Sequence, residues 1–120
     1  AIDDEFVYID GTEAGNYKVK KLRKSDLTQV AESADYGDVI MAIAVDDEFV
    51  YVGGGSDIST VKKLKKSDLS QVAESARYGE GIYGTINAIA IDDVFVYVGG
   101  TAKTVKVIEN CDLIKIIRRY

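Results

Sequence analysis

Apolar residues recur at every second position along much of the chain, and most of them are β-branched or aromatic. This period of two is typical of β-strands, because successive side chains of a strand point to opposite faces. Residues 40–45 and 86–91 are apolar or small on both alternating faces, which predicts strands covered on both sides. Residues 6–9, 49–52 and 95–98 have the same pattern. The chain is therefore expected to be all-β.

Two less apolar segments follow each of these strand pairs. In the middle of the chain, residues 60–65 are predicted as a third strand and residues 69–78 as a fourth. The sequence QVAESA in the fourth segment is also compatible with a helical turn, because Gln, Ala and Glu favour helices; we prefer a strand. Asp46 and Asp47 separate the first two strands, and their short acidic side chains favour a turn by accepting hydrogen bonds from backbone amides.

The same pattern is present three times. Residues 19–37 and 61–79 differ at only three positions, and the sequence DDEFVY at residues 3–8 returns at 46–51 and, with one change, at 92–97. The second copy of this motif begins 43 residues after the first, and the third begins 46 residues after the second. Periods of this length are typical of repeat architectures, in which one unit cannot bury its own faces alone. The expected units are 1–40 (with a truncated first strand), 41–83, and a divergent 84–120.

Four antiparallel strands per unit, apolar first and polar last, are what a blade of a β-propeller requires. The sequence AIAVDDEFVYVGG at residues 42–54 resembles the hairpin of quinoprotein-like and YVTN-type propellers, and the whole unit resembles a WD-repeat blade. The resemblance extends over the whole chain and implies a β-propeller of four-stranded blades, three per chain. The chain contains no Trp, so it lacks the WD dipeptide and the tryptophan docking pattern of quinoproteins, and no cofactor is expected.

Three blades cannot close a ring, since closed propellers typically have about 4 to 8. The apolar flanks of the first and third blades would stay exposed in a monomer, and such patches mark association surfaces. We therefore predict a homodimer in which two chains complete a six-bladed ring through head-to-tail contacts. Two alternatives stay open, namely a larger ring of three chains and a chain that is one segment of a longer propeller.

Composition argues against several classes of function. The net charge is −5, with lysines and arginines scattered among acidic residues, which disfavours a nucleic-acid partner. The chain has no His and a single Cys, Cys111, so we expect no internal disulfide, no zinc site and no histidine general base. No apolar stretch approaches the roughly 18 residues of a membrane span, and no membrane partner is expected. No signal peptide is visible, and the compartment is unknown.

The repeated Asp pairs are the most prominent candidates for chemistry. Carboxylates arranged around an axis can coordinate Ca²⁺, but the spacing of an EF-hand loop is absent, so turn formation is the better interpretation. Solvated turn carboxylates are expected to keep ordinary pKa values and to be poor general acids, and the chain offers no His base for a Ser or Cys nucleophile. We expect no catalytic residue, no metal site and no enzymatic activity.

The connections at the rim opposite the Asp turns are better candidates for binding. They combine Tyr, Gly and acidic residues, and stacking aromatic rings beside carboxylates suit a sugar or a peptide. For Tyr36, Tyr78 and Tyr120 we prefer packing between blades over ligand binding, because they share one position in the repeat, whereas Tyr83 has no counterpart. The candidate ligand-binding residues are Tyr36, Asp38, Asp57, Tyr78, Glu80 and Tyr83.

The sequence favours a non-enzymatic propeller scaffold that presents repeated loops to a protein or peptide partner. The alternative is a lectin-like, carbohydrate-binding propeller with one site per blade, which requires the candidate tyrosines to be exposed beside Asp38 and Glu80. A hydrolase or lyase would require a buried carboxylate in a pocket. The near-identity of two units also fits recent amplification of one blade without an evolved ligand.

Overall fold

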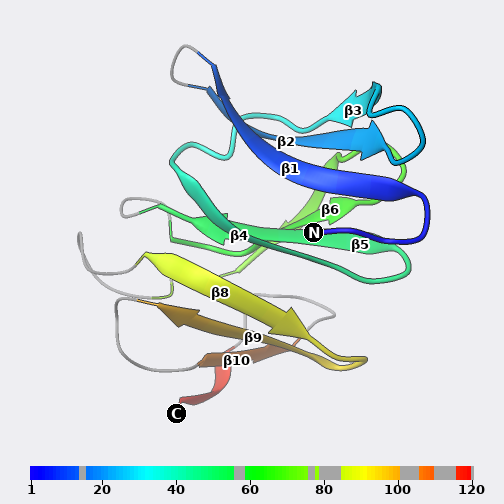
Figure 1. Cartoon of the computed structure of the whole chain (residues 1–120). Coiled ribbons are helices and arrows are strands. Elements are labelled where there is room, and N and C mark those ends of the chain that lie inside the picture. The colour runs from blue at the N-terminus through cyan, green and yellow to red at the C-terminus, as the bar shows by residue number, and fades with distance from the viewer. Residues whose placement is uncertain are drawn as a thin grey trace.

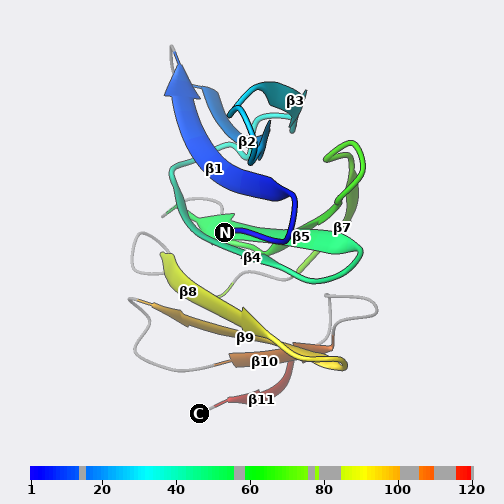
Figure 2. The same cartoon turned by 45° about the vertical axis from the view of Figure 1, so that its right-hand side comes forward.

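The computed structural model describes residues 1–13, 16–55, 59–75, 78, 85–100, 106–109 and 116–119. In these residues all regular structure is β, arranged as three antiparallel sheets, so the predicted all-β class is confirmed. The sheets follow one another along the chain as a stack, from the blue N-terminal end to the red C-terminal end (Figure 1). Figure 2 shows the same order from a second direction.

Each sheet is a meander, in which strands that are neighbours in sequence are also neighbours in the sheet. The first sheet consists of β1 (Phe6–Glu13), β2 (Asn16–Arg23) and β3 (Gln29–Glu32). The second consists of β4 (Ile40–Val45), β5 (Phe49–Gly54), β6 (Lys62–Lys65) and β7 (Gln71–Glu74). The third consists of β8 (Ile86–Ile91), β9 (Phe95–Gly100), β10 (Lys106–Glu109) and β11 (Ile116–Arg119).

The fourth segment of each unit is a strand, as preferred over the helical turn, but it is shorter than expected. In the second sheet the strand spans only Gln71–Glu74 instead of residues 69–78. Leu69 belongs to the preceding turn, since it has a φ of 62° and its amide donates to the carbonyl of Lys65 at 2.8 Å. At the other end, the Ser75 hydroxyl accepts a hydrogen bond from the Val61 amide at 2.8 Å and takes the place of a ladder partner.

The second and third sheets have the same strand register. Ile40 pairs with Gly54 and Ala42 with Gly53, with a bulge between the two pairs. Ile86 and Gly100 form the corresponding pair in the third sheet, with a bulge at the same place. The first sheet has three strands, and beside β1 an isolated bridge joins Ile2 to Val7. Equivalent sequence positions therefore occupy equivalent places in successive sheets.

Two apolar clusters hold the sheets together. Val50 and Val52 of β5 pack on the first sheet, and Val96 and Val98 of β9 pack in the same way on the second. Burying one such side chain is worth about 1.5–3 kcal/mol. The buried residues are Tyr8, Val19, Tyr36, Ile40, Val50, Val52, Leu64 and Leu69 in the first cluster, and Tyr51, Val61, Tyr78, Ile86, Val96, Val98 and Ile108 in the second.

Candidate functional site

Three Asp turns form one rim of the stack, which we call the acidic rim. In the second sheet, one carboxylate oxygen of Asp46 accepts hydrogen bonds from the amides of Glu48 at 2.9 Å and Phe49 at 2.7 Å. The prediction that these acidic residues form turns through backbone amides is confirmed. The same two bonds, at the same distances, link Asp3 to Glu5 and Phe6, and Asp92 to Val94 and Phe95.

A tyrosine fixes the second carboxylate oxygen of each turn. The Tyr8 hydroxyl donates to Asp3 Oδ2 at 2.9 Å, and its ring is buried in the core. The corresponding bonds, from Tyr51 to Asp46 and from Tyr97 to Asp92, measure 2.8 Å each. We did not predict this pairing from the sequence. A signal was nevertheless present, because the Asp and the Tyr stand five residues apart in every copy of the DDEFVY motif.

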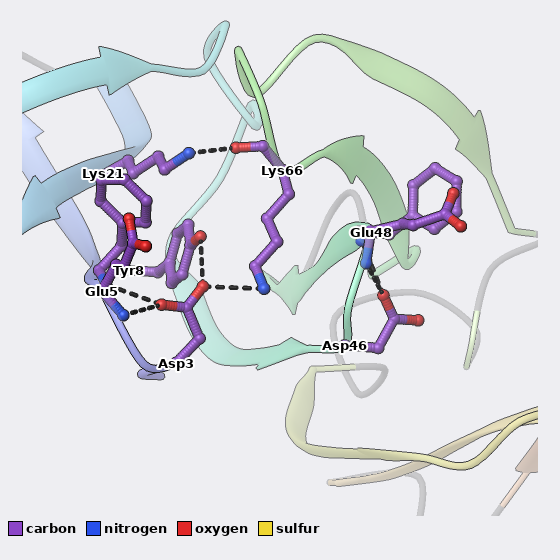
Figure 3. Close-up of polar contacts among 9 residues, drawn as sticks. Asp3, Glu5, Tyr8, Lys21, Asp46, Glu48 and Lys66 are labelled. Atoms are coloured by element: carbon purple, nitrogen blue, oxygen red, sulfur yellow. Dashed lines mark hydrogen bonds and ion pairs between the residues drawn. The ribbon is translucent and has the colours of Figure 1, made fainter.

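Two lysines cross the joint between the first and second sheets beside Asp3. Lys66 Nζ lies 2.8 Å from Asp3 Oδ2, and the Lys66 carbonyl accepts a hydrogen bond from Lys21 Nζ at 2.7 Å (Figure 3). Lys21 is buried, and its ammonium lies 4.1 Å from the centroid of the Phe6 ring. In the second sheet, Lys63 lies over Phe49 at the same distance. A lysine ammonium over an aromatic ring is a favourable cation–π contact.

These contacts change the ionisation of the site. Burial alone would raise the pKa of Asp3, but hydrogen bonds from Lys66, the turn amides and Tyr8 outweigh it and hold the pKa well below its ordinary value of 3.8. Burial and the Asp3 carboxylate raise the pKa of Tyr8 above its usual range. Burial lowers the pKa of Lys21. The expectation of ordinary pKa values for the turn carboxylates is therefore wrong for Asp3. It is also wrong for the exposed Asp92, because hydrogen bonds from the Phe95 and Val94 amides lower the pKa of that carboxyl.

The lowered pKa of Asp3 predicts how its contribution to stability depends on pH. A carboxyl whose pKa is depressed by folding stabilises the protein above its unfolded pKa, and this stabilisation is lost as the pH falls. We expect Asp3→Asn to lower the free energy of unfolding by about 2 kcal/mol at pH 7. The difference from wild type should shrink steadily below about pH 4. Urea unfolding monitored by circular dichroism at pH 7, 5, 4 and 3 measures this difference.

Asp4 provides the control for that experiment, because it is the exposed neighbour in the same turn. Asp4→Asn is expected to change the free energy of unfolding by less than about 0.5 kcal/mol. A difference between Asp3→Asn and wild type that stays constant down to pH 3 would show that the Asp3 carboxylate is not held in its ionised form by the fold.

Two open clefts lie on the acidic rim, one at each joint between sheets. The first has a volume of about 500 Å³ and the second about 640 Å³. Equivalent residues line them, since Phe6 and Val45 in the first correspond to Phe49 and Ile91 in the second. Five carboxylates face two lysines in the first cleft and one lysine in the second. The acidic residues are Asp3, Asp4, Glu5, Asp46 and Asp47 in the first, and Asp46, Asp47, Glu48, Asp92 and Asp93 in the second.

The tyrosines predicted to bind a ligand are part of the core. Tyr36 is only 3% exposed, and its hydroxyl donates to the Thr60 carbonyl at 2.6 Å and accepts from the Gly54 amide at 3.1 Å. Burial raises the pKa of Tyr36 to about 12. Tyr78 is 2% exposed and packs in the second apolar cluster. The preferred interpretation, packing of the repeated tyrosine between successive sheets, is therefore confirmed for both residues, and neither offers an exposed ring to a ligand. Tyr120 lies outside the described residues.

The remaining predicted residues do not form a described site. Asp38 is half-buried, and its side chain accepts a hydrogen bond from the Val39 amide at 2.7 Å. Asp57, Glu80 and Tyr83 lie outside the described residues. Within the described ranges, no three acidic or Cys side chains are grouped so that they could hold a metal ion. In the same ranges, the structure contains no helix with the length and apolarity to cross a membrane.

Comparisons with known proteins bear on the fold alone. No protein-family model matches the chain, and no curated protein is similar to it in sequence. Among solved structures, it is similar to hydrazine synthase from Kuenenia stuttgartiensis, with a TM-score of 0.77 and 18% sequence identity. The likeness covers 98% of this chain and 32% of that chain. This chain thus spans about a third of the length of that protein.

Proposed function

We propose that this chain is a non-enzymatic β-propeller scaffold, which associates through its end sheets and binds a protein or peptide segment along the acidic rim. The observation that carries the proposal is the pair of equivalent clefts, built at successive joints from equivalent residues. In this proposal each sheet is one blade. The antiparallel meanders packed face to face support it, because consecutive blades of a propeller pack in this way. Repeating one cleft in this way is typical of scaffolds that bind extended partners.

The chemistry of the clefts defines the kind of segment that fits. Phe6 lines the first cleft and Phe49 the second, and in both the lining carboxylates outnumber the lysines. An extended peptide that alternates basic with apolar side chains satisfies both features. The turn Asp46-Asp47 lines both clefts, so one peptide can occupy them together. Occupying two linked sites raises the overall affinity beyond that of either one.

The same groups favour binding over catalysis. The Asp3 carboxylate is held in its ionised form by Lys66, Tyr8 and two amides, which makes it a poor proton donor. The chain has no His to activate a nucleophile. A carbohydrate site is not proposed, because Tyr36 and Tyr78 do not offer exposed rings for stacking.

Binding of a labelled peptide tests the proposal. The probe is a fluorescent peptide of about eight residues that alternates Arg and Val, compared with a peptide in which Glu replaces each Arg. We expect only the basic peptide to raise the fluorescence anisotropy, and its affinity to fall as salt is added. Asp47→Lys should weaken this binding at least about tenfold, because Asp47 faces both clefts.

Asp10→Lys is the matched control, since it makes the same change of charge at an exposed position of β1 outside both clefts. Its affinity for the basic peptide should stay within about threefold of wild type. If both variants lost the same affinity for the basic peptide, the effect would come from net charge alone, and binding in the clefts would be contradicted. Absence of binding by the wild-type protein would contradict the peptide-binding part of the proposal.

A further inference from the structure

Within the described residues, no sheet covers one face of the first sheet, although the equivalent faces of the other two sheets are packed against a neighbouring sheet. Leu69 of the second sheet is 1% exposed and packs against the first sheet, whereas the equivalent Leu27 is 62% exposed. The same contrast separates Val52 of the second sheet, which is buried, from the equivalent Ile9 of the first sheet, which is exposed. We call the face that carries Val7, Ile9, Leu22 and Leu27 the leading face. Its counterparts in the second and third sheets are the faces that rest on the preceding sheet.

Leu27 has the same unusual backbone conformation as Leu69. The φ angles are 60° and 62°, a region that leucine rarely adopts because of steric repulsion at Cβ. At Leu69 this conformation places the side chain in the joint between two sheets. At Leu27 the same backbone holds the side chain where an equivalent joint would cover it.

The third sheet offers the complementary face at the other end of the stack. Tyr8 and Tyr51 are buried because the following sheet packs against them, whereas the equivalent Tyr97 is only half-buried. Asp92, bonded to Tyr97, is exposed. We call this the trailing face. It corresponds to the surfaces that receive the second sheet and the third sheet within the chain.

The charges at the two ends are complementary in the same way as those at the internal joint. Within the chain, Lys66 of the second sheet pairs with Asp3 of the first at 2.8 Å. The equivalents at the two ends are Lys24 on the leading face and Asp92 on the trailing face. In the described part of the structure, the Lys24 side chain makes no hydrogen bond or ion pair, and Asp92 has no cationic partner.

We infer that the leading face docks on the trailing face of a second copy of this chain, with Lys24 of one copy paired to Asp92 of the other. The inference rests on the association of end sheets in the proposed function and specifies its contacts. A second copy is the occupant that the structure favours, because this chain already contains the matching surface, the matching turn and the matching carboxylate. Leu27 then fills the position of Leu69, and the two copies carry two such joints.

Dissociation constants measured by sedimentation equilibrium test this interface. We expect Leu27→Asp to weaken association at least about hundredfold, since it places a charge in an apolar joint. Val30→Asp is the matched control, because Val30 and its counterpart Val72 are both 43% exposed, which shows that a neighbouring sheet does not cover this position. Its dissociation constant should stay within about threefold of wild type. Circular dichroism confirms that both variants are folded.

A double-mutant cycle tests the specific pair. Lys24→Met and Asp92→Asn should each weaken association about tenfold, and Asn keeps an oxygen that can accept the hydrogen bonds of the turn amides. The protein carrying both changes should be weakened no further than either variant alone, because the second change removes a group whose partner is already gone. Asp93→Asn, at the next position of the same turn, should have little effect alone, and its effect should simply add to that of Lys24→Met. Additive weakening in the protein carrying Lys24→Met and Asp92→Asn would overturn the pairing. A dimer that is unaffected by Leu27→Asp and by Lys24→Met would overturn the interface while association itself stands. A wild-type monomer at 100 μM would overturn both the inference and the association in the proposed function.

Discussion

Replacing Gly54 by alanine is expected to lower the free energy of unfolding by about 3 kcal/mol. A Cβ at this position would overlap the carbonyl oxygen of Val39 and lie 2.7 Å from the Met41 amide nitrogen. Both atoms belong to the backbone at the bulge where β4 pairs with β5, so a side-chain rotation cannot relieve the overlap. Gly54 also donates its amide to the Tyr36 hydroxyl, and the shift would disturb that bond between sheets. Urea unfolding measures the effect as a lower midpoint.

Gly11→Ala is the matched control, because Gly11 is the equivalent position in the first sheet. There the nearest atoms to an added Cβ belong to the flexible Lys20 side chain, with Cε at 3.3 Å. We expect a change of less than about 1 kcal/mol. Gly100→Ala should behave like Gly54→Ala, since its Cβ would overlap the Thr85 carbonyl oxygen. Equal stability of the Gly11 and Gly54 variants would contradict the close approach of β4 to β5.

The parts of the fold that could be predicted from the sequence are those with local causes. Alternating apolar residues predict the strands, and the hydrogen bonds that Asp46 accepts from the amides of Glu48 and Phe49 reach only two and three residues along the chain. The choice of strand over helix for Gln71–Glu74 was correct because the alternation continues through it. The ends of this strand were wrong because the turn at Leu69 and the Ser75 hydroxyl replace ladder partners.

The contacts of the candidate site were harder to predict because they join distant residues. Lys21 has the sequence context of an exposed strand lysine, yet it is buried and donates to Lys66, 45 residues away. Its aliphatic stem packs at the joint while the ammonium reaches a carbonyl of the next sheet. Tyr36 was a candidate for binding a ligand, but it lies in the core. Its repeated position already indicated packing, and the combination of Tyr with acidic residues was a weaker guide to function than the period itself.

The joint between the first and second sheets predicts a second large effect. Leu69→Ala is expected to lower the free energy of unfolding by about 3 kcal/mol, because it removes most of a side chain that is 1% exposed and leaves a cavity in the core. Val72→Ala is the control in the same unit. Its side chain is 43% exposed, and the expected loss is below about 0.5 kcal/mol. The measurement is again urea unfolding, with all three proteins at one low concentration.

A glycine at the same position separates the two roles of Leu69. Leu69→Gly removes the same buried side chain, but glycine adopts a φ of 62° without the steric cost that leucine and alanine share. We therefore expect Leu69→Gly to be more stable than Leu69→Ala by about 1 kcal/mol, although both are less stable than wild type. If Leu69→Ala were as stable as wild type, the side chain would not hold the two sheets together. If glycine were the less stable of the pair, the turn would not have the left-handed conformation that aims Leu69, and by equivalence Leu27, into a joint.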